Sequence, residues 1–156
     1  MKAFLEYINQ VIELTAEEES LLASKLKVRN YLKGQYILQG GDTSRYLTFI
    51  LSGKVRTFYL DDNGNEHIIS FGIENWWVGD ICSFNTQSPA DFHVQCLENT
   101  KVVQLSYDNL ERLYIDIPKL ERFFRLIVQS AYGKSQKRIV RNYSLSAKER
   151  YLLFCE

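Results

Sequence analysis

The sequence predicts a mainly β, α+β domain in which a small antiparallel sheet rolls up between flanking helices. Glycines fall at short intervals through the middle of the chain, at Gly34, Gly41, Gly53, Gly64 and Gly79. They separate runs rich in β-branched and aromatic residues, as at the corners of a rolled sheet. Helical periodicity is confined to the two ends of the chain. Together these observations give the fold class.

Two short helices are predicted before the sheet. Apolar residues recur at helical spacing within residues 4–12. Thr15 and Glu18 then form a capping-box pattern, which opens a second helix with its apolar residues within 21–26. We expect both helices to pack on the sheet.

Strands are predicted from about Val28 to Leu105. Their ranges are residues 36–38, 46–51, 55–60, 67–71, 92–96 and 101–105. Turn residues separate them, and the Asn63-Gly64 pair suits a hairpin because both residues tolerate a left-handed backbone.

The pattern becomes helical again after the last strand. Ser106 is placed to cap a short helix through Tyr114, and Pro118 to start a long one that runs towards Asn142. The apolar stripe of this long helix persists for about six turns, longer than the sheet is expected to cover. Part of it should therefore meet a second copy of the chain, as a homodimer. The residues expected in that interface are Phe123, Phe124, Ile127, Val128, Ala131 and Tyr132.

Composition excludes several classes of protein. The 156 residues are 46% hydrophobic, and 19 basic residues balance 19 acidic ones, so net charge indicates no polyanionic partner. No apolar run approaches the roughly 20 residues needed to cross a bilayer, and we expect a cytoplasmic protein with no membrane partner. The widely spaced Cys82, Cys96 and Cys155 indicate neither a disulfide framework nor a metal site.

Three segments carry a resemblance to a known family. These are LKGQYILQGGD (residues 32–42), YLTFILSGKVR (46–56) and DNGNE (62–66). Their combined spacing resembles the cyclic nucleotide-binding domain of the cyclic AMP receptor and fumarate–nitrate regulator (Crp/Fnr) family of transcription regulators. The resemblance implies a double-stranded, jelly-roll-like β-roll with N-terminal helices and a long C-terminal dimerisation helix.

The same resemblance implies three regions. Residues 1–116 would form the sensor roll with its helices, and residues 117–143 the dimerisation helix. Residues 144–156 would form the hinge and the start of a winged helix-turn-helix DNA-binding domain, with Ser146 as a helix cap.

The resemblance also indicates a ligand pocket. In the family, a Gly-Glu-Leu segment opens a helical turn whose amides hold the cyclic phosphate, and its Glu holds the ribose hydroxyl. Here the matching segment begins at Gly79, and Asp80 could take the place of the Glu with a shorter reach. The candidate ligand-binding residues are Gly79, Asp80, Ile81, Cys82, Ser83, Ala90, Asp91 and His93.

The second half of that pocket departs from the family pattern. A downstream Arg-Ser pair neutralises the phosphate in the family, and the position of its arginine falls near Ala90. The neighbouring Asp91 would repel a phosphate, whereas an arginine would supply charge-assisted hydrogen bonds. His93 could supply a cation, although a lone strand histidine is more often a packed or surface residue. We therefore expect no tight cyclic AMP binding, and leave open another small-molecule effector or no ligand.

Metal-based sensing and catalysis find little support. Cluster-binding relatives of this fold carry grouped cysteines ahead of the roll, and this sequence has none before Cys82. His67 and Cys82 could ligate a haem, but neither lies in a haem motif. His67 and His93 are the only histidines, and no nucleophile motif accompanies them, so we expect no enzyme.

The end of the chain indicates the output. Residues 134–156 hold six basic and two acidic residues, a net charge of +4 in a protein that is neutral overall. The sequence stops at Glu156, partway through an apolar helix, so we expect a longer natural protein. Its partners would be DNA, through the missing domain, with RNA polymerase as a further candidate. The alternative is a stand-alone ligand-binding or interaction module without a DNA-reading role.

Overall fold

The computed structural model describes residues 2–144 and Glu149. It divides the chain into two compact units, Met1–Pro118 and Lys119–Glu156. Within the described part of the chain, no helix combines the length and apolar character that a membrane crossing requires. The predictions that rest on Ser146 and Cys155 lie outside the described residues, as does nearly all of the predicted hinge.

The first unit begins with two helices. They are α1 (Lys2–Asn9) and α2 (Ala16–Lys25). The predicted capping box is confirmed, because the Glu18 N–H donates to Thr15 Oγ1 at 3.2 Å and the Thr15 N–H to Glu18 Oε2 at 2.7 Å. Helix α1 ends earlier than predicted, where Asn9 Oδ1 accepts a hydrogen bond from the Leu14 N–H at 3.0 Å and the chain turns.

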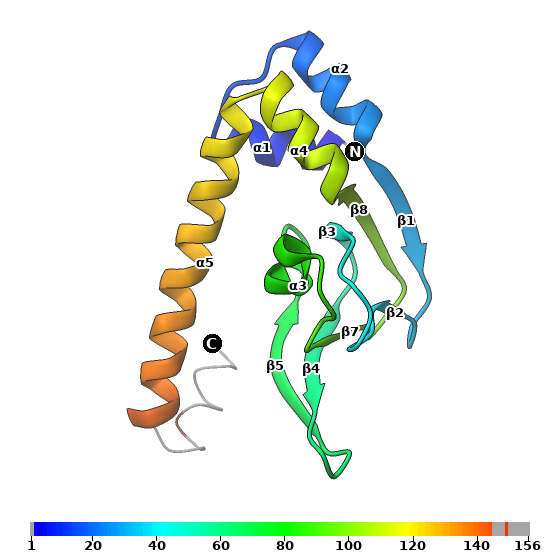
Figure 1. Ribbon diagram of the computed structural model, residues 1–156, viewed down its shortest axis with the longest axis vertical. Coiled ribbons are helices and arrows are strands. Elements are labelled where there is room, and N and C mark those ends of the chain that lie inside the picture. The colour runs from blue at the N-terminus through cyan, green and yellow to red at the C-terminus, as the bar shows by residue number, and fades with distance from the viewer. Residues whose placement is uncertain (1, 145–148, 150–156) are drawn as a thin grey trace. The chain divides into compact units, whose positions relative to one another are not determined.

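The predicted β-roll is confirmed as two four-stranded antiparallel sheets (Figure 1). One sheet has the order β1 (Lys27–Tyr31), β8 (Thr100–Ser106), β3 (Tyr46–Ser52), β6 (Trp77–Val78). The other has the order β2 (Tyr36–Leu38), β7 (His93–Cys96), β4 (Val55–Leu60), β5 (Glu66–Gly72). Strands β1 and β6 were not among the predicted ranges.

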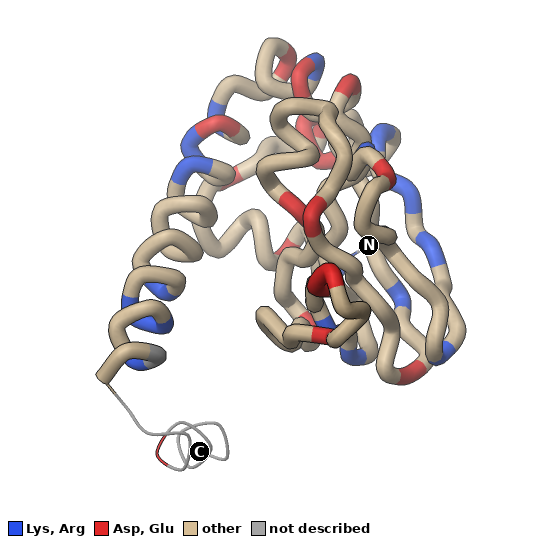
Figure 2. Tube along the Cα trace, turned by 60° about the horizontal axis from the view of Figure 1, so that its bottom comes forward, with Lys and Arg blue, Asp and Glu red and all other residues tan. Residues whose placement is uncertain are grey.

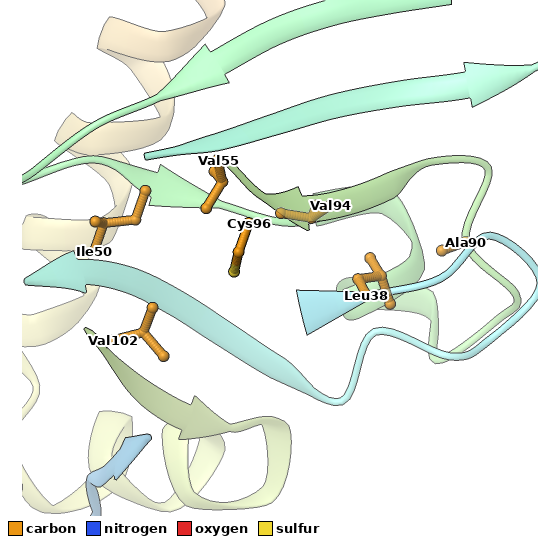
Figure 3. Packing of buried hydrophobic residues seen from close by; sticks show 7 residues of the cluster. All are labelled: Leu38, Ile50, Val55, Ala90, Val94, Cys96 and Val102. Carbon is orange, nitrogen blue, oxygen red and sulfur yellow. The ribbon is translucent and has the colours of Figure 1, made fainter. Parts of the chain in front are cut away.

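Successive side chains of the central strands point to opposite faces of the sheet, which produces two apolar layers. On β3, Ile50 points into the space between the two sheets, and Phe49 points to the opposite face. The inner layer contains Leu38, Ile50, Val55, Ala90, Val94, Cys96 and Val102, all buried (Figure 3). It joins the two sheets across their facing surfaces.

The outer layer is aromatic and receives α1. The ring of Phe4 lies edge-on to Phe49, with centroids 5.0 Å apart, and to Trp77, with centroids 5.6 Å apart. Because Trp77 belongs to β6, the first helix packs across the pairing of β6 with β3. The expectation that an N-terminal helix packs on the sheet is thereby met for α1.

Within residues 2–144, three helices follow β6. They are α3 (Ile81–Thr86), α4 (Tyr107–Asp116) and α5 (Lys119–Ser144). The predicted cap of α4 is confirmed, since Ser106 Oγ accepts a hydrogen bond from the Asn109 N–H at 3.4 Å. Helix α5 has 26 residues and begins one residue after Pro118.

Candidate functional site

Asp80 organises the segment between β6 and β7, where the sequence places the ligand pocket. Gly79 precedes it with a φ of +133°, which favours glycine, and turns the chain out of β6. The Asp80 carboxylate then caps α3, because Oδ1 accepts a hydrogen bond from the Ser83 N–H at 3.0 Å. Oδ2 accepts from the Asp91 N–H, also at 3.0 Å. One buried side chain, 3% exposed, therefore ties the start of α3 to the loop before β7.

Ser83 connects α3 to a second loop. Its Oγ accepts a hydrogen bond from the Ser44 N–H at 2.9 Å and donates to the Ser88 carbonyl at 2.5 Å. Both Ser44 and Ser83 are buried. The short helix is thus fixed at its start by Asp80 and along its length by Ser83.

Ala90 occupies the position where the sequence aligns the family's phosphate-binding arginine. Its methyl group belongs to the inner apolar layer, with Val94 and Leu38 among the members (Figure 3). Its backbone is also fixed, since its N–H donates to the Asp42 carbonyl at 2.9 Å and its carbonyl accepts from the Gly41 N–H at 2.8 Å. The structure thus holds an apolar side chain, and no cation, at this point.

The electrostatics around α3 disfavour an anion. The Asp80 carboxylate already accepts a hydrogen bond from the Ser83 amide in the first turn of α3, where a helix start would otherwise favour an anion. Asp91 adds an exposed carboxylate on the same loop. A phosphate approaching this turn would meet negative charge and no arginine from Ala90.

The eight predicted ligand residues do not form one group. Gly79 to Ser83 are joined to Ala90 and Asp91 through Asp80, with Ile81 and Cys82 exposed at the surface of α3. His93 is the exception. It lies on the face of β7 opposite Val94, which points into the inner layer.

His93 is packed on that opposite face. Its ring stacks on Phe58, with centroids 5.0 Å apart and an interplanar angle of 15°, and lies edge-on to Tyr36. Its Nδ1 accepts a hydrogen bond from the Gly40 N–H at 3.2 Å. We therefore leave His93 out of the proposed site.

Sequence reasoning missed Ser44 and the backbone of residues 41–42 as supports of the site. The Gly41-Asp42 turn was visible as a turn signal, but its pairing with Ala90 spans two distant segments. No local pattern marks such a pairing.

The other predicted candidate, His67, is engaged in a hairpin turn. Its Nε2 lies 3.0 Å from Asp61 Oδ2, and its ring stacks on Tyr59 with centroids 4.8 Å apart. The hydrogen bonds from His67 and Asn65 hold the pKa of Asp61 below its usual range. Within residues 2–144 and Glu149, no three His, Cys, Asp or Glu side chains are grouped to hold a metal ion.

The fold and this segment place the protein in a known class. The family model for the cyclic nucleotide-binding domain matches residues 28–116, and the chain belongs to that family. The match runs from β1 to the end of α4 and includes the whole segment around α3.

Curated relatives are bacterial regulators. The chain is 29% identical over 122 residues to the anaerobic regulatory protein of Pasteurella multocida, covering 78% of this chain and 44% of that protein. It is 27% identical over 122 residues to the transcriptional activator protein Anr of Pseudomonas protegens, covering 78% and 49%. The chain thus spans about half the length of these relatives.

Solved structures share the fold. A cyclic nucleotide-binding domain from Methylobacillus flagellatus superposes with a TM-score of 0.75 at 23% identity, covering 91% of this chain and 83% of that one. The catabolite activator protein of Thermus thermophilus gives a TM-score of 0.71 at 20% identity, covering 85% and 61%. The predicted resemblance to this group of regulators is confirmed.

The two hydrogen bonds of Asp80 give a stability prediction. Asp80→Ala removes the acceptor of two backbone N–H groups and should lower the free energy of unfolding by about 2 kcal/mol or more. Asp80→Asn should cost less, because its amide retains one acceptor oxygen. Urea unfolding followed by circular dichroism measures both.

Asp91→Ala is the matched control. It removes an exposed carboxylate from the same loop but keeps the backbone N–H that donates to Asp80. It should change the free energy of unfolding by no more than about 0.5 kcal/mol. Equal losses for Asp80→Ala and Asp91→Ala would contradict the role given to Asp80.

Proposed function

We propose that this chain is the ligand-sensing and dimerisation region of a bacterial Crp/Fnr-type transcription regulator that does not bind cyclic AMP tightly. The observation that carries the second part is Ala90, whose methyl group lies in the inner apolar layer where the resemblance places an arginine. The regulators among its relatives support the first part.

The site around α3 supports sensing of something other than a cyclic nucleotide, or signalling without one. Gly79 still permits close approach of a ligand to the backbone. The carboxylate of Asp80 nevertheless occupies the helix start in place of a phosphate. Any effector of this segment would therefore be neutral or cationic where it meets α3.

Dimerisation is proposed through α5. Its side chains at Val128, Tyr132, Ile139 and Tyr143 are exposed in the single chain and are spaced by four, seven and four residues. That spacing aligns them on one side of the helix. Each large side chain would contribute on the order of 1.5 to 3 kcal/mol if a second copy covered it fully.

The proposed interface leaves out one residue of the predicted set and adds Ile139 and Tyr143. Phe123 is fully buried in the single chain, so we leave it out. Phe124 and Ile127 are partly buried, while Val128, Ala131 and Tyr132 are exposed. Basic residues recur further along the same helix (Figure 2), at Lys134, Lys137, Arg138 and Arg141.

The dimer can be tested by placing a charge in the stripe. Val128→Asp would bury a carboxylate between two helices and should give a monomer, since an unpaired buried charge is strongly unfavourable. Ser130→Asp adds the same charge about 200° around the helix and should leave the dimer intact. Sedimentation at micromolar concentration measures both, and a monomeric parent protein would contradict the proposal.

The cyclic nucleotide prediction is tested by calorimetry. We expect cyclic AMP and cyclic GMP to bind with dissociation constants no tighter than about 100 μM, because the site lacks a charge-assisted contact worth about 1.5 to 3 kcal/mol and adds carboxylates. A dissociation constant below about 1 μM for either nucleotide would show that the site around Ala90 has been misread.

The regulator assignment is tested on the full gene product. A dimer of such regulators presents two reading helices on one side of the duplex, so footprinting should reveal a two-fold symmetric site with half-sites about 10 bp apart. Protection should be sought with and without cell extract, which would supply an effector. Absence of any palindromic site under both conditions would favour the stand-alone interaction module.

A further inference from the structure

The space between the two sheets is apolar at one end and polar at the other. On the inner faces of β3 and β8, Ile50 pairs with Val102, and both belong to the apolar layer. Two residues further along each strand, and on the same inner faces, Thr48 pairs with Gln104. Both are buried, and Gln104 is only 3% exposed. A buried amide in such a layer requires partners for its oxygen and its nitrogen.

Gln104 has partners for only one of these two atoms. Its Nε2 donates to Thr48 Oγ1 at 3.2 Å and to the Tyr31 hydroxyl at 3.3 Å. Its Oε1 is buried and has no hydrogen-bond partner among the described residues. Exchanging the amide oxygen and nitrogen would leave the nitrogen unpaired instead. One polar atom of this amide therefore has no partner among the described residues.

A cavity lies at this amide. It has a volume of about 220 Å³, and its wall includes Gln104, Thr48 and Tyr31. It adjoins a wider groove of about 610 Å³, and the two share Arg29, Tyr31, Tyr36 and Gln39. Since β1 is an edge of one sheet and β2 an edge of the other, the cavity opens between two sheet edges.

The wall of the cavity carries more positive than negative charge. Arg29 and Arg45 line it, with Asp42 as the acidic residue of the lining. In the described part of the chain, neither arginine has a carboxylate within salt-bridge distance. The guanidinium of Arg29 instead lies 5.6 Å from the ring centroid of Tyr46, a cation–π contact.

We propose that this inter-sheet cavity binds a small anion that also carries a hydroxyl or amino group, such as a hydroxy acid or a sugar phosphate. Its anionic group would pair with Arg29 and Arg45, because a guanidinium is the preferred partner of carboxylate and phosphate. Its hydroxyl or amino group would donate to Gln104 Oε1. Neutral apolar molecules would satisfy neither requirement.

The cavity does not include α3, but two of its lining residues support the start of that helix. Gly79 and Ser44 line the cavity, and Ser44 donates its backbone N–H to Ser83 of α3. A bound anion would therefore contact the loop that fixes α3. This proposal does not depend on the assignment as a transcription regulator.

The test titrates the 156-residue protein with glycerol 3-phosphate, ribose 5-phosphate, 3-phosphoglycerate and lactate in a calorimeter. At least one should bind with a dissociation constant below about 1 mM. Inorganic phosphate and glycerol, tested separately, should bind at least about tenfold more weakly than that ligand, because each offers only one of the two required groups.

Three variants connect binding to the cavity. Arg29→Gln and Gln104→Glu should each weaken the affinity at least about tenfold, the first by removing a cation and the second by placing a carboxylate against the anion. Arg112→Gln, an identical loss of charge at an exposed site on α4, should bind like the parent. Thermal unfolding of each variant confirms that it is folded.

Several results would overturn the proposal. They are no binding by any of the four probes, equal binding by inorganic phosphate alone, and unchanged affinity in both Arg29→Gln and Gln104→Glu. A loss in Arg112→Gln as large as that in Arg29→Gln would reveal non-specific attraction to surface charge. If Gln104→Glu fails to fold, Gln104→Leu replaces it, because it removes the unpaired acceptor and keeps an apolar interior.

Discussion

The buried carboxylate of Asp80 fixes the part of the roll where the resemblance predicts the ligand pocket. It holds two backbone amides that belong to different segments, at the start of α3 and at Asp91. Burying a carboxylate is costly unless its oxygens are hydrogen-bonded, so the local backbone must keep this geometry. The same group sets the charge of the site. A turn held by its own carboxylate has little remaining capacity to hold an anionic ligand.

Two independent features disfavour an anionic ligand at this turn. Asp80 supplies negative charge at the start of α3, and Ala90 supplies a methyl group to the inner layer. If only the arginine were missing, the amides of α3 could still attract a phosphate through their partial positive charge. If only Asp80 were present, a nearby arginine could compensate it. The proposal that this segment does not hold a phosphate therefore rests on both features together.

Most strands could be predicted because their signals are local. Glycines at the corners and β-branched or aromatic runs between them were enough to place β3, β4, β5 and β8. Strand β1 was missed because the consecutive polar residues Arg29 and Asn30 break the alternation that marks a strand, and its ladder with β8 supplies the order. Strand β6 has two residues, and it is defined by its pairing with Thr48 and Phe49, which lie far away in the sequence.

The site was predicted less completely than the fold, for a related reason. Residue types suggested that Asp80 faces a ligand, but its two partners are amides that only the folded loop brings to it. The sequence also gives no sign that His93 on β7 pairs with Phe58 on β4, because the strand register decides which face a side chain takes. Periodicity located the segments, and long-range pairing determined their roles.

The polar end of the inner layer has a consequence for how a signal could arise in this fold. An apolar interior is insensitive to small polar molecules, whereas a buried amide with an unpaired oxygen gains a hydrogen bond when a donor arrives. Gln104 lies on β8 at the centre of its sheet, between β1 and β3. Ser44 lies at the entrance to β3 and holds α3 through Ser83. A ligand that contacts both Arg45 and Gln104 would therefore touch β8 and also the loop that holds α3. It would change the preferred position of α3 without entering the turn that Asp80 caps.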